Sequence, residues 1–260
     1  ASPPAIAKGF NSPSQMLGGS TTLTFTIHNP NANVALTAIG FTDTLPAGMV
    51  VATPSGAANT CGGATSANAG AASVSLSGGA LAAGASCAVS VNVTSTTAGV
   101  KENNVLVTSE VGPGNTSTAT LTVIGPPAIS KAFGAASIPL DGVTTLSFTI
   151  QNTNGTASLT GIGFIDTLPA GLAIPQPNGQ SGTCGGGAIT AAAGGNTVTL
   201  SGATLAQSAS CTFSVNVMGV SPEIKDNTTG NVTSNEEGTG GTASASLTVL
   251  VRPPIPTLSG

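Results

Sequence analysis

Residues 21–27 read TTLTFTI, a run in which apolar residues alternate with threonine. Because successive side chains of a strand point to opposite faces, Leu23, Phe25 and Ile27 should face one side and the threonines the other. The segment CAVSVNV at 87–93 alternates in the same way, and clusters rich in Asn, Gly and Pro separate such runs. No stretch shows a helical period. The pattern predicts an all-β fold whose strands each bury one face.

The chain is an internal duplication. The sequence PPAIAKGF at 3–10 recurs as PPAISKAF at 126–133, and LTAIGFTDTLPAG at 36–48 recurs as LTGIGFIDTLPAG at 159–171. Each copy is about 125 residues long, which is enough to bury a core of its own. We expect seven or eight short strands in each copy, which is typical of an immunoglobulin-like sandwich. The repeat therefore predicts two tandem immunoglobulin-like antiparallel β-sandwiches.

The expected domains are residues 1–124 and 125–251, followed by a Pro-rich C-terminal tail at 252–260. Only the sequence Gly125-Pro126-Pro127 separates the last strand of the first copy from the second copy. Proline fixes its own φ and keeps the preceding residue extended, so this joint should be short and semi-rigid. We expect the two domains to follow one another end to end as a rod.

The chain is nearly uncharged, with five Lys or Arg, nine Asp or Glu and a net charge of −4 over 260 residues. Nucleic-acid-binding proteins usually carry a basic patch, and the sequence has no basic cluster. Trp and Tyr are absent, which removes the side chains that most often stack on bases or anchor interfaces. No apolar run reaches the roughly 18 residues of a transmembrane helix. We therefore expect no nucleic-acid partner and no membrane contact by this segment.

Four cysteines fall as two pairs at equivalent positions of the repeat, Cys61 with Cys87 and Cys184 with Cys211. In an exported protein this arrangement favours one disulfide in each domain. The alternative is a metal site, which is disfavoured because the chain has no CxxC motif and His28 is its only histidine. We expect no metal and no cofactor.

His28 also bears on the question of catalysis. Gln151 takes its place in the second copy, and no second histidine or nucleophile motif is present to complete a hydrolase triad. The glycine-rich stretches at 61–63 and 184–187 lack the lysine and the following helix of a phosphate-binding loop. The sequence thus predicts no catalytic residue, and we expect the protein not to be an enzyme.

Two charged residues recur in register at positions that should face the core. Lys8 alternates with Ile6 and Phe10, and Asp43 follows Phe41 on one strand face. A buried charge is costly unless it is paired or neutralised, so each domain should pair its lysine with its aspartate inside the sandwich. The second copy holds the same two residues, Lys131 and Asp166.

An asparagine accompanies this pair late in each copy, Asn103 in VKENN and Asn227 in IKDNT, and the first copy also offers Asn104. Three interpretations stay open: a buried Lys–Asp ion pair, a Lys–Asn isopeptide cross-link promoted by the Asp, and a surface ion pair. The cross-link requires a neutral amine as nucleophile and a protonated carboxyl that polarises the amide, and burial favours both neutral forms.

The segments STTLTFTIHNPN, LTAIGFTDTLPAG, TCGG and SLSGGALAAGASC resemble the bacterial surface repeats known as domain of unknown function eleven. The resemblance covers nearly all of both copies and implies immunoglobulin-like modules in long exported proteins. The sequence PIPTLS at 254–259 is similar to the opening of the IPTL-type carboxy-terminal sorting signal of Gram-negative bacteria, which implies an outer-surface destination. The Lys, Asp and Asn positions also resemble the isopeptide triads of Gram-positive pilins and collagen-adhesin domains.

Together these observations predict a non-enzymatic structural module of a bacterial cell-surface or extracellular protein. It would act as a stalk, or as a subunit that binds copies of itself head to tail in a filament. The alternative is an adhesin or ligand-binding module that recognises a host or matrix component. The near-equal spacing of the two copies and the absence of Tyr and Trp favour the structural interpretation.

Overall fold

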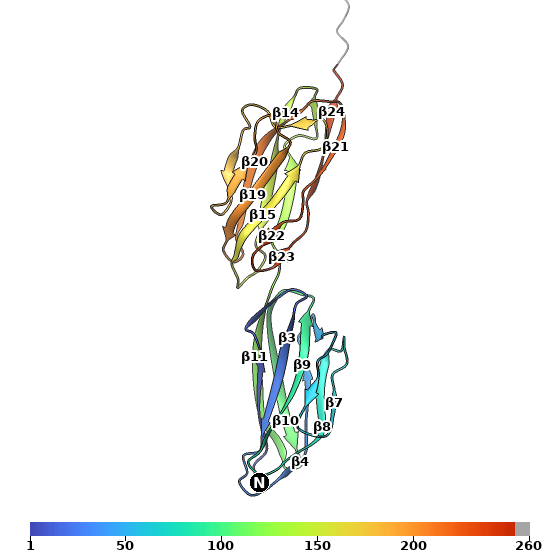
Figure 1. Ribbon diagram of the computed structural model, residues 1–260, viewed down its shortest axis with the longest axis vertical. Coiled ribbons are helices and arrows are strands. Elements are labelled where there is room, and N and C mark those ends of the chain that lie inside the picture. The colour runs from blue at the N-terminus through green and yellow to red at the C-terminus, as the bar shows by residue number, and fades with distance from the viewer. Residues whose placement is uncertain (253–260) are drawn as a thin grey trace, which may run out of the picture. The chain divides into compact units, whose positions relative to one another are not determined.

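The computed structural model describes residues 1–252, and every regular element in that range is a β-strand (Figure 1). The chain divides into two compact units after Gly125. The predicted all-β fold, with two tandem immunoglobulin-like antiparallel β-sandwiches, is confirmed. The sorting motif at 254–259 and most of the tail at 252–260 lie outside the described residues.

Unit 1 is a sandwich of two sheets. One sheet has the order β1-β3-β9-β5, with β6 beside β9, and the other has the order β2-β11-β10-β4-β8-β7. Neighbouring strands are antiparallel except β2 and β11, which run parallel. The strands are β1 (Ala5–Phe10), β2 (Ser14–Met16), β3 (Ser20–His28), β4 (Leu36–Thr44), β5 (Met49–Val51), β6 (Ala58–Asn59), β7 (Ala64–Ser66), β8 (Ser73–Leu81), β9 (Ser86–Ser95), β10 (Gly99–Ser109) and β11 (Gly112–Ile124).

Unit 2 repeats this plan with shorter pieces. Its sheets have the orders β12-β14-β20-β16, with β17 beside β20, then β18-β19-β15-β22-β23 and β13-β24-β21. The strands are β12 (Ala128–Phe133), β13 (Ser137–Pro139), β14 (Val143–Gln151), β15 (Leu159–Thr167), β16 (Leu172–Ala173), β17 (Ser181–Thr183), β18 (Ala188–Thr190), β19 (Thr197–Leu205), β20 (Ser210–Gly219), β21 (Glu223–Thr228), β22 (Thr233–Ser234), β23 (Gly238–Thr239) and β24 (Ser244–Leu250).

The described residues form eleven strands in unit 1 and thirteen in unit 2, more than the seven or eight expected in each. The additional strands are two or three residues long, such as β6 and β23, and lie in turn-rich segments. A strand this short cannot show an alternating pattern, so the sequence does not mark it. In unit 2 the region that corresponds to β10 is also broken into β21 and β22.

The alternation in the sequence becomes the core between the sheets. Leu23, Phe25 and Ile27 of β3 have no exposed surface. The Phe25 ring stacks on that of Phe41 in the opposite sheet with centroids 4.5 Å apart. Such an aromatic pair contributes about 0.5–1.5 kcal/mol beyond the burial of its surface. Phe25 therefore fixes the spacing of the two sheets, and its ring also forms one wall of the site described below.

The free edge of β1 is closed by side chains of β11. The Asn115 side chain accepts a hydrogen bond from the Ile6 backbone N–H at 2.7 Å and donates one to the Ile6 carbonyl at 2.9 Å. The Ser117 hydroxyl accepts one from the Lys8 backbone N–H at 3.0 Å. These side chains take the place of a neighbouring strand, which protects the edge from pairing with another chain. The equivalent residues of unit 2 have no polar side chain; they are Gly241 and Ala243.

Candidate functional site

The structure buries an ion pair between Lys8 of β1 and Asp43 of β4. Lys8 Nζ lies 2.5 Å from Asp43 Oδ1, and neither side chain has any exposed surface. The ammonium also lies 5.3 Å from the centroid of the Phe25 ring, within the range of a cation–π interaction. β1 and β4 belong to different sheets, so the pair crosses the interior of the sandwich. Full burial excludes the surface ion pair that the sequence left open.

The second copy reproduces this arrangement. Lys131 of β12 places its Nζ 2.6 Å from Asp166 Oδ1 of β15, with both side chains fully buried. The Phe148 ring centroid lies 5.5 Å from the same Nζ. The duplication has therefore kept a costly arrangement at equivalent places in two units.

An asparagine completes each cluster from a third strand. Asn103 of β10 donates from Nδ2 to Asp43 Oδ2 at 2.9 Å, and Asn227 of β21 donates to Asp166 Oδ2 at the same distance. Both asparagines are 1% exposed, and the Oδ1 atom of each has no hydrogen-bond partner among residues 1–252. Asn104, the alternative in the first copy, is exposed and accepts a hydrogen bond from the Thr118 hydroxyl instead. The structure thus brings Lys, Asp and Asn together in each unit.

The cluster is electrostatically strained. Desolvation by burial lowers the pKa of the Lys8 ammonium, and the hydrogen bond and charge of Asp43 offset only part of this effect. The pKa of Lys131 is lowered for the same reasons, with Asp166 as its partner. A buried carbonyl without a donor adds a cost of about 1–3 kcal/mol. Burial therefore favours a neutral lysine amine inside each sandwich, close to an asparagine whose carbonyl oxygen has no hydrogen-bond donor.

A second buried lysine in each unit was not singled out from the sequence. Lys101 of β10 is 7% exposed and donates to the Ala47 carbonyl at 3.1 Å and the Thr97 hydroxyl at 2.6 Å. Lys225, at the same place in unit 2, donates to Ser221 at 3.1 Å. The signal was available, because Lys101 lies two residues before Asn103 and so shares its strand face.

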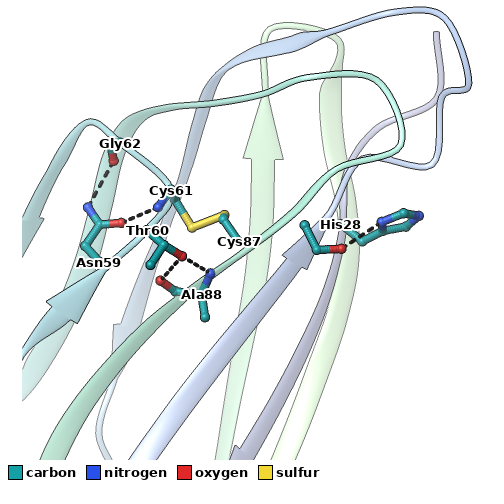
Figure 2. The surroundings of a disulfide bond; sticks show 8 residues. His28, Asn59, Thr60, Cys61, Gly62, Cys87 and Ala88 are labelled. Carbon is teal, nitrogen blue, oxygen red and sulfur yellow. Dashed lines mark hydrogen bonds between the residues drawn. A yellow bond between two sulfur atoms is a disulfide. The ribbon is translucent and has the colours of Figure 1, made fainter.

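The cysteines form one disulfide in each unit, Cys61–Cys87 and Cys184–Cys211, and no free cysteine is present among residues 1–252. Figure 2 shows how the first one is held. The Asn59 side chain accepts from the Cys61 backbone N–H at 2.7 Å, and the Thr60 hydroxyl accepts from the Ala88 backbone N–H at 2.8 Å. The bridge therefore fastens a loop to β9, away from the Lys–Asp–Asn cluster.

The single histidine has no catalytic surroundings. His28 is exposed, and its Nδ1 lies 3.0 Å from the hydroxyl of Ser86, its cross-strand partner (Figure 2). No acidic side chain among residues 1–252 forms an ion pair with it, so no carboxylate orients the ring as in a triad. Over the same residues no group of His, Cys, Asp and Glu could hold a metal ion. No helix in the described range could cross a lipid bilayer.

Each unit matches one family model, described as "Domain of unknown function (DUF7933)", over residues 4–123 and 127–249. The C-terminal domain of the Streptococcus agalactiae antigen I/II polypeptide BspA is similar in structure, with a TM-score of 0.53 and 10% identity over 95% of this chain and 100% of that one. The C-terminal domain of the Streptococcus pyogenes antigen I/II-family protein AspA gives a TM-score of 0.55 and 10% identity, over 93% and 98%. No curated protein matches the chain in sequence.

At 10% identity these likenesses show a shared fold and nothing finer. The resemblance to domain of unknown function eleven and the sorting signal both stay predictions. What the two units have in common beyond the fold is the buried cluster and the disulfide.

Proposed function

The chain belongs to the DUF7933 family of domains of unknown function, and from this premise we propose that it is a load-bearing structural module of an exported bacterial surface protein. The observation that carries the proposal is the Lys–Asp–Asn cluster. In each unit it joins the first long strand to two strands that lie outside that strand's own sheet, by contacts of 2.5–2.9 Å. A tie between the beginning and the end of a domain is useful where the two ends are pulled apart.

Two further features support an exported protein. Disulfides persist in oxidising compartments outside the cytoplasm, and each unit has one. The structural neighbours are domains of streptococcal antigen I/II proteins. We propose that this chain, too, belongs to an exported bacterial surface protein. In that setting the chain would serve as a stalk, or as a subunit that joins copies of itself head to tail. Electron microscopy of the native cell surface distinguishes a fringe of stalks from filaments.

Single-molecule force spectroscopy tests the load-bearing role. The complete chain is held at its two ends and compared with the double variant Lys8→Met, Lys131→Met. We expect the wild-type chain to resist extension at forces that already extend the variant, because the variant lacks the tie between strands. Equal forces for the two chains would contradict the proposal. The double variant Lys101→Met, Lys225→Met is the matched control, since it also removes one buried lysine from each unit.

The second candidate is an adhesin, and one surface of unit 2 favours it. Ile165 on β15 is 57% exposed and lines a groove of about 550 Å³ together with Leu200 and Asn231. Unit 1 has Thr42 at the equivalent place. Beads coated with the chain should then adhere to matrix-coated surfaces, and Ile165→Thr should release them. Wild-type beads that fail to adhere would leave only the structural role, and equal retention of both kinds of bead would exclude Ile165 from the binding surface.

A further inference from the structure

We propose that each cluster closes on itself to form an amide bond, between Lys8 Nζ and Asn103 Cγ in unit 1 and between Lys131 Nζ and Asn227 Cγ in unit 2. The bond is intramolecular and needs no enzyme, cofactor or oxidant. It goes beyond the proposed function because it is a chemical modification of this chain, whatever load the chain bears.

The first argument is position. One carboxylate holds both reacting groups: Lys8 on Oδ1 at 2.5 Å and Asn103 on Oδ2 at 2.9 Å. The two oxygens of a carboxylate share one carbon, so the amine and the amide are neighbours. All three side chains come from strands whose backbones are fixed by their sheets. Groups held on one carboxylate in this way react as if at very high concentration.

The second argument is protonation. A lysine is a nucleophile only as the neutral amine, and Asp43 Oδ1 is in contact to accept its proton. Both side chains are fully buried, and burial favours the neutral amine and neutral acid over two charges. Transfer of one proton over the Lys8–Asp43 contact therefore produces the amine and a protonated carboxyl together.

The third argument is the unpartnered amide oxygen. Asn103 Oδ1 is buried and has no donor, and rotation of the amide by half a turn would place it against Asp43 Oδ2. There the protonated carboxyl donates to it, which polarises the carbonyl and makes Cγ electrophilic. Asp43 thus serves both reaction partners, as a base for the lysine and as an acid for the asparagine.

The reaction balances without any other reagent. Lys8 Nζ attacks Asn103 Cγ, the carbon–nitrogen bond to Nδ2 breaks, and the proton lost by Nζ is passed by Asp43 to the leaving nitrogen. The products are one secondary amide and one molecule of ammonia, and Asp43 is left as the neutral acid that it became in the first proton transfer. The bond also removes a buried ammonium from the core, which makes the product less costly to bury than the reactants.

The bond would connect strands of two different sheets and enclose most of each unit. Residues 9–102 lie between the joined residues in unit 1, and residues 132–226 in unit 2. Tension applied at the chain ends would pass through the amide and leave these segments unextended. At about 3.4 Å per residue, each unit would release about 32 nm less chain than one without the bond.

Intact mass spectrometry of the complete chain tests the proposal. We expect a mass about 38 Da below that of the sequence, about 34 Da from two molecules of ammonia and about 4 Da from two disulfides. After reduction a deficit of about 34 Da should remain, and a tryptic digest should contain a branched peptide that joins Lys8 to Asn103. A folded protein with a deficit of only about 4 Da before reduction, and none after it, would overturn the proposal.

Variants test whether the residues of the cluster carry out the cross-linking reaction. Asn103→Ala and Asp43→Asn should each halve the deficit that remains after reduction, whereas Lys101→Met should leave it unchanged. Circular dichroism shows whether each variant folds. The branched peptide of the wild-type chain shows the cross-link directly, even if a variant fails to fold. A full deficit in Asn103→Ala would exclude Asn103 as the acceptor. A chain with the full deficit that extends at low force would refute the load-bearing role and keep the cross-link.

Discussion

Asn103 donates its amide hydrogen to Asp43 Oδ2 over 2.9 Å, while its own Oδ1 has no hydrogen-bond partner in the described part of the chain. The interior of a sandwich normally satisfies both halves of a buried amide. The second copy leaves the same atom of Asn227 unpartnered. The proposed cross-link would account for this cost in both units, because the reaction uses the unpartnered carbonyl.

Loss of one partner of the buried pair should be severe. In a chain with Asn103→Ala, where Lys8 stays a free amine, Lys8→Met leaves the Asp43 carboxylate without its counter-charge, and such a change costs about 3–5 kcal/mol of unfolding free energy. Urea denaturation of the variant measures this, and Lys101→Met serves as the control because no carboxylate depends on it. The double variant Lys8→Met, Asp43→Leu should recover part of the loss. A single change that costs less than about 1 kcal/mol would contradict a buried charged pair.

The pH dependence of stability should reveal whether Lys8 still titrates. In a chain with Asn103→Ala and Asn227→Ala, both lysines stay free and burial lowers their pKa below the ordinary value of 10.5. The unfolded chain then binds protons more tightly, so the unfolding free energy should rise with pH between the lowered folded pKa and 10.5.

In the cross-linked wild-type chain these lysines are amides and do not titrate, so this rise should be missing. Denaturant titrations from neutral to alkaline pH compare the two chains. Parallel slopes for wild type and variant would speak against the cross-link.

Because only unit 1 closes the edge of its first strand with side chains, we expect substitutions at this edge to change the stability of the two units in opposite directions. Asn115→Ala removes both side-chain bonds to Ile6 and should cost unit 1 about 1–3 kcal/mol. Gly241→Asn tests the converse in unit 2, where a Cβ added at this glycine meets no atom within 4 Å. It should close the edge of β12 and raise stability by about 1 kcal/mol. Thermal denaturation measures both effects, and a destabilised Gly241→Asn chain would show that the two edges are not equivalent.

Each disulfide should stabilise its unit by about 3 kcal/mol, because it closes a loop with a sequence separation of 26 or 27 residues. The double variant Cys61→Ser, Cys87→Ser should lower the unfolding free energy of unit 1 by this amount. Calorimetry with and without reductant measures this difference in unfolding free energy. If reductant lowers the unfolding free energy of the wild-type chain by much less, the loop is already ordered without the bridge.

Strand alternation was enough to predict the inward positions of Lys8 and Asp43, because each lies in a strand with a clear apolar face. It did not choose between Asn103 and Asn104, since residues 101–104, KENN, are all polar and show no alternation. In the structure Val105 and Val107 are buried and share a strand face with Asn103, which places Asn103, and not Asn104, in the core. The same parity places Lys101 inside, which the sequence analysis missed.

The edge closure of β1 could not have been predicted from the sequence. Asn115 and Ile6 are 109 residues apart, and a side chain that replaces a strand leaves no periodic signal. The short strands were missed for a related reason, because their pairing depends on neighbours brought close by the rest of the fold. The local sequence pattern thus predicts the strands that have a buried face. The long-range polar contacts become known only from the folded structure.

The places of Lys8 and Asn103 have a consequence for proteolysis. Every loop of unit 1 between β1 and β10 lies between these two residues in the sequence. In a unit closed by the amide, a protease that cuts one of these loops yields two fragments that stay covalently joined. The nicked chain would still connect whatever precedes the unit to whatever follows it. Outside a cell, where proteases are common, such a protein would be cut without being shed.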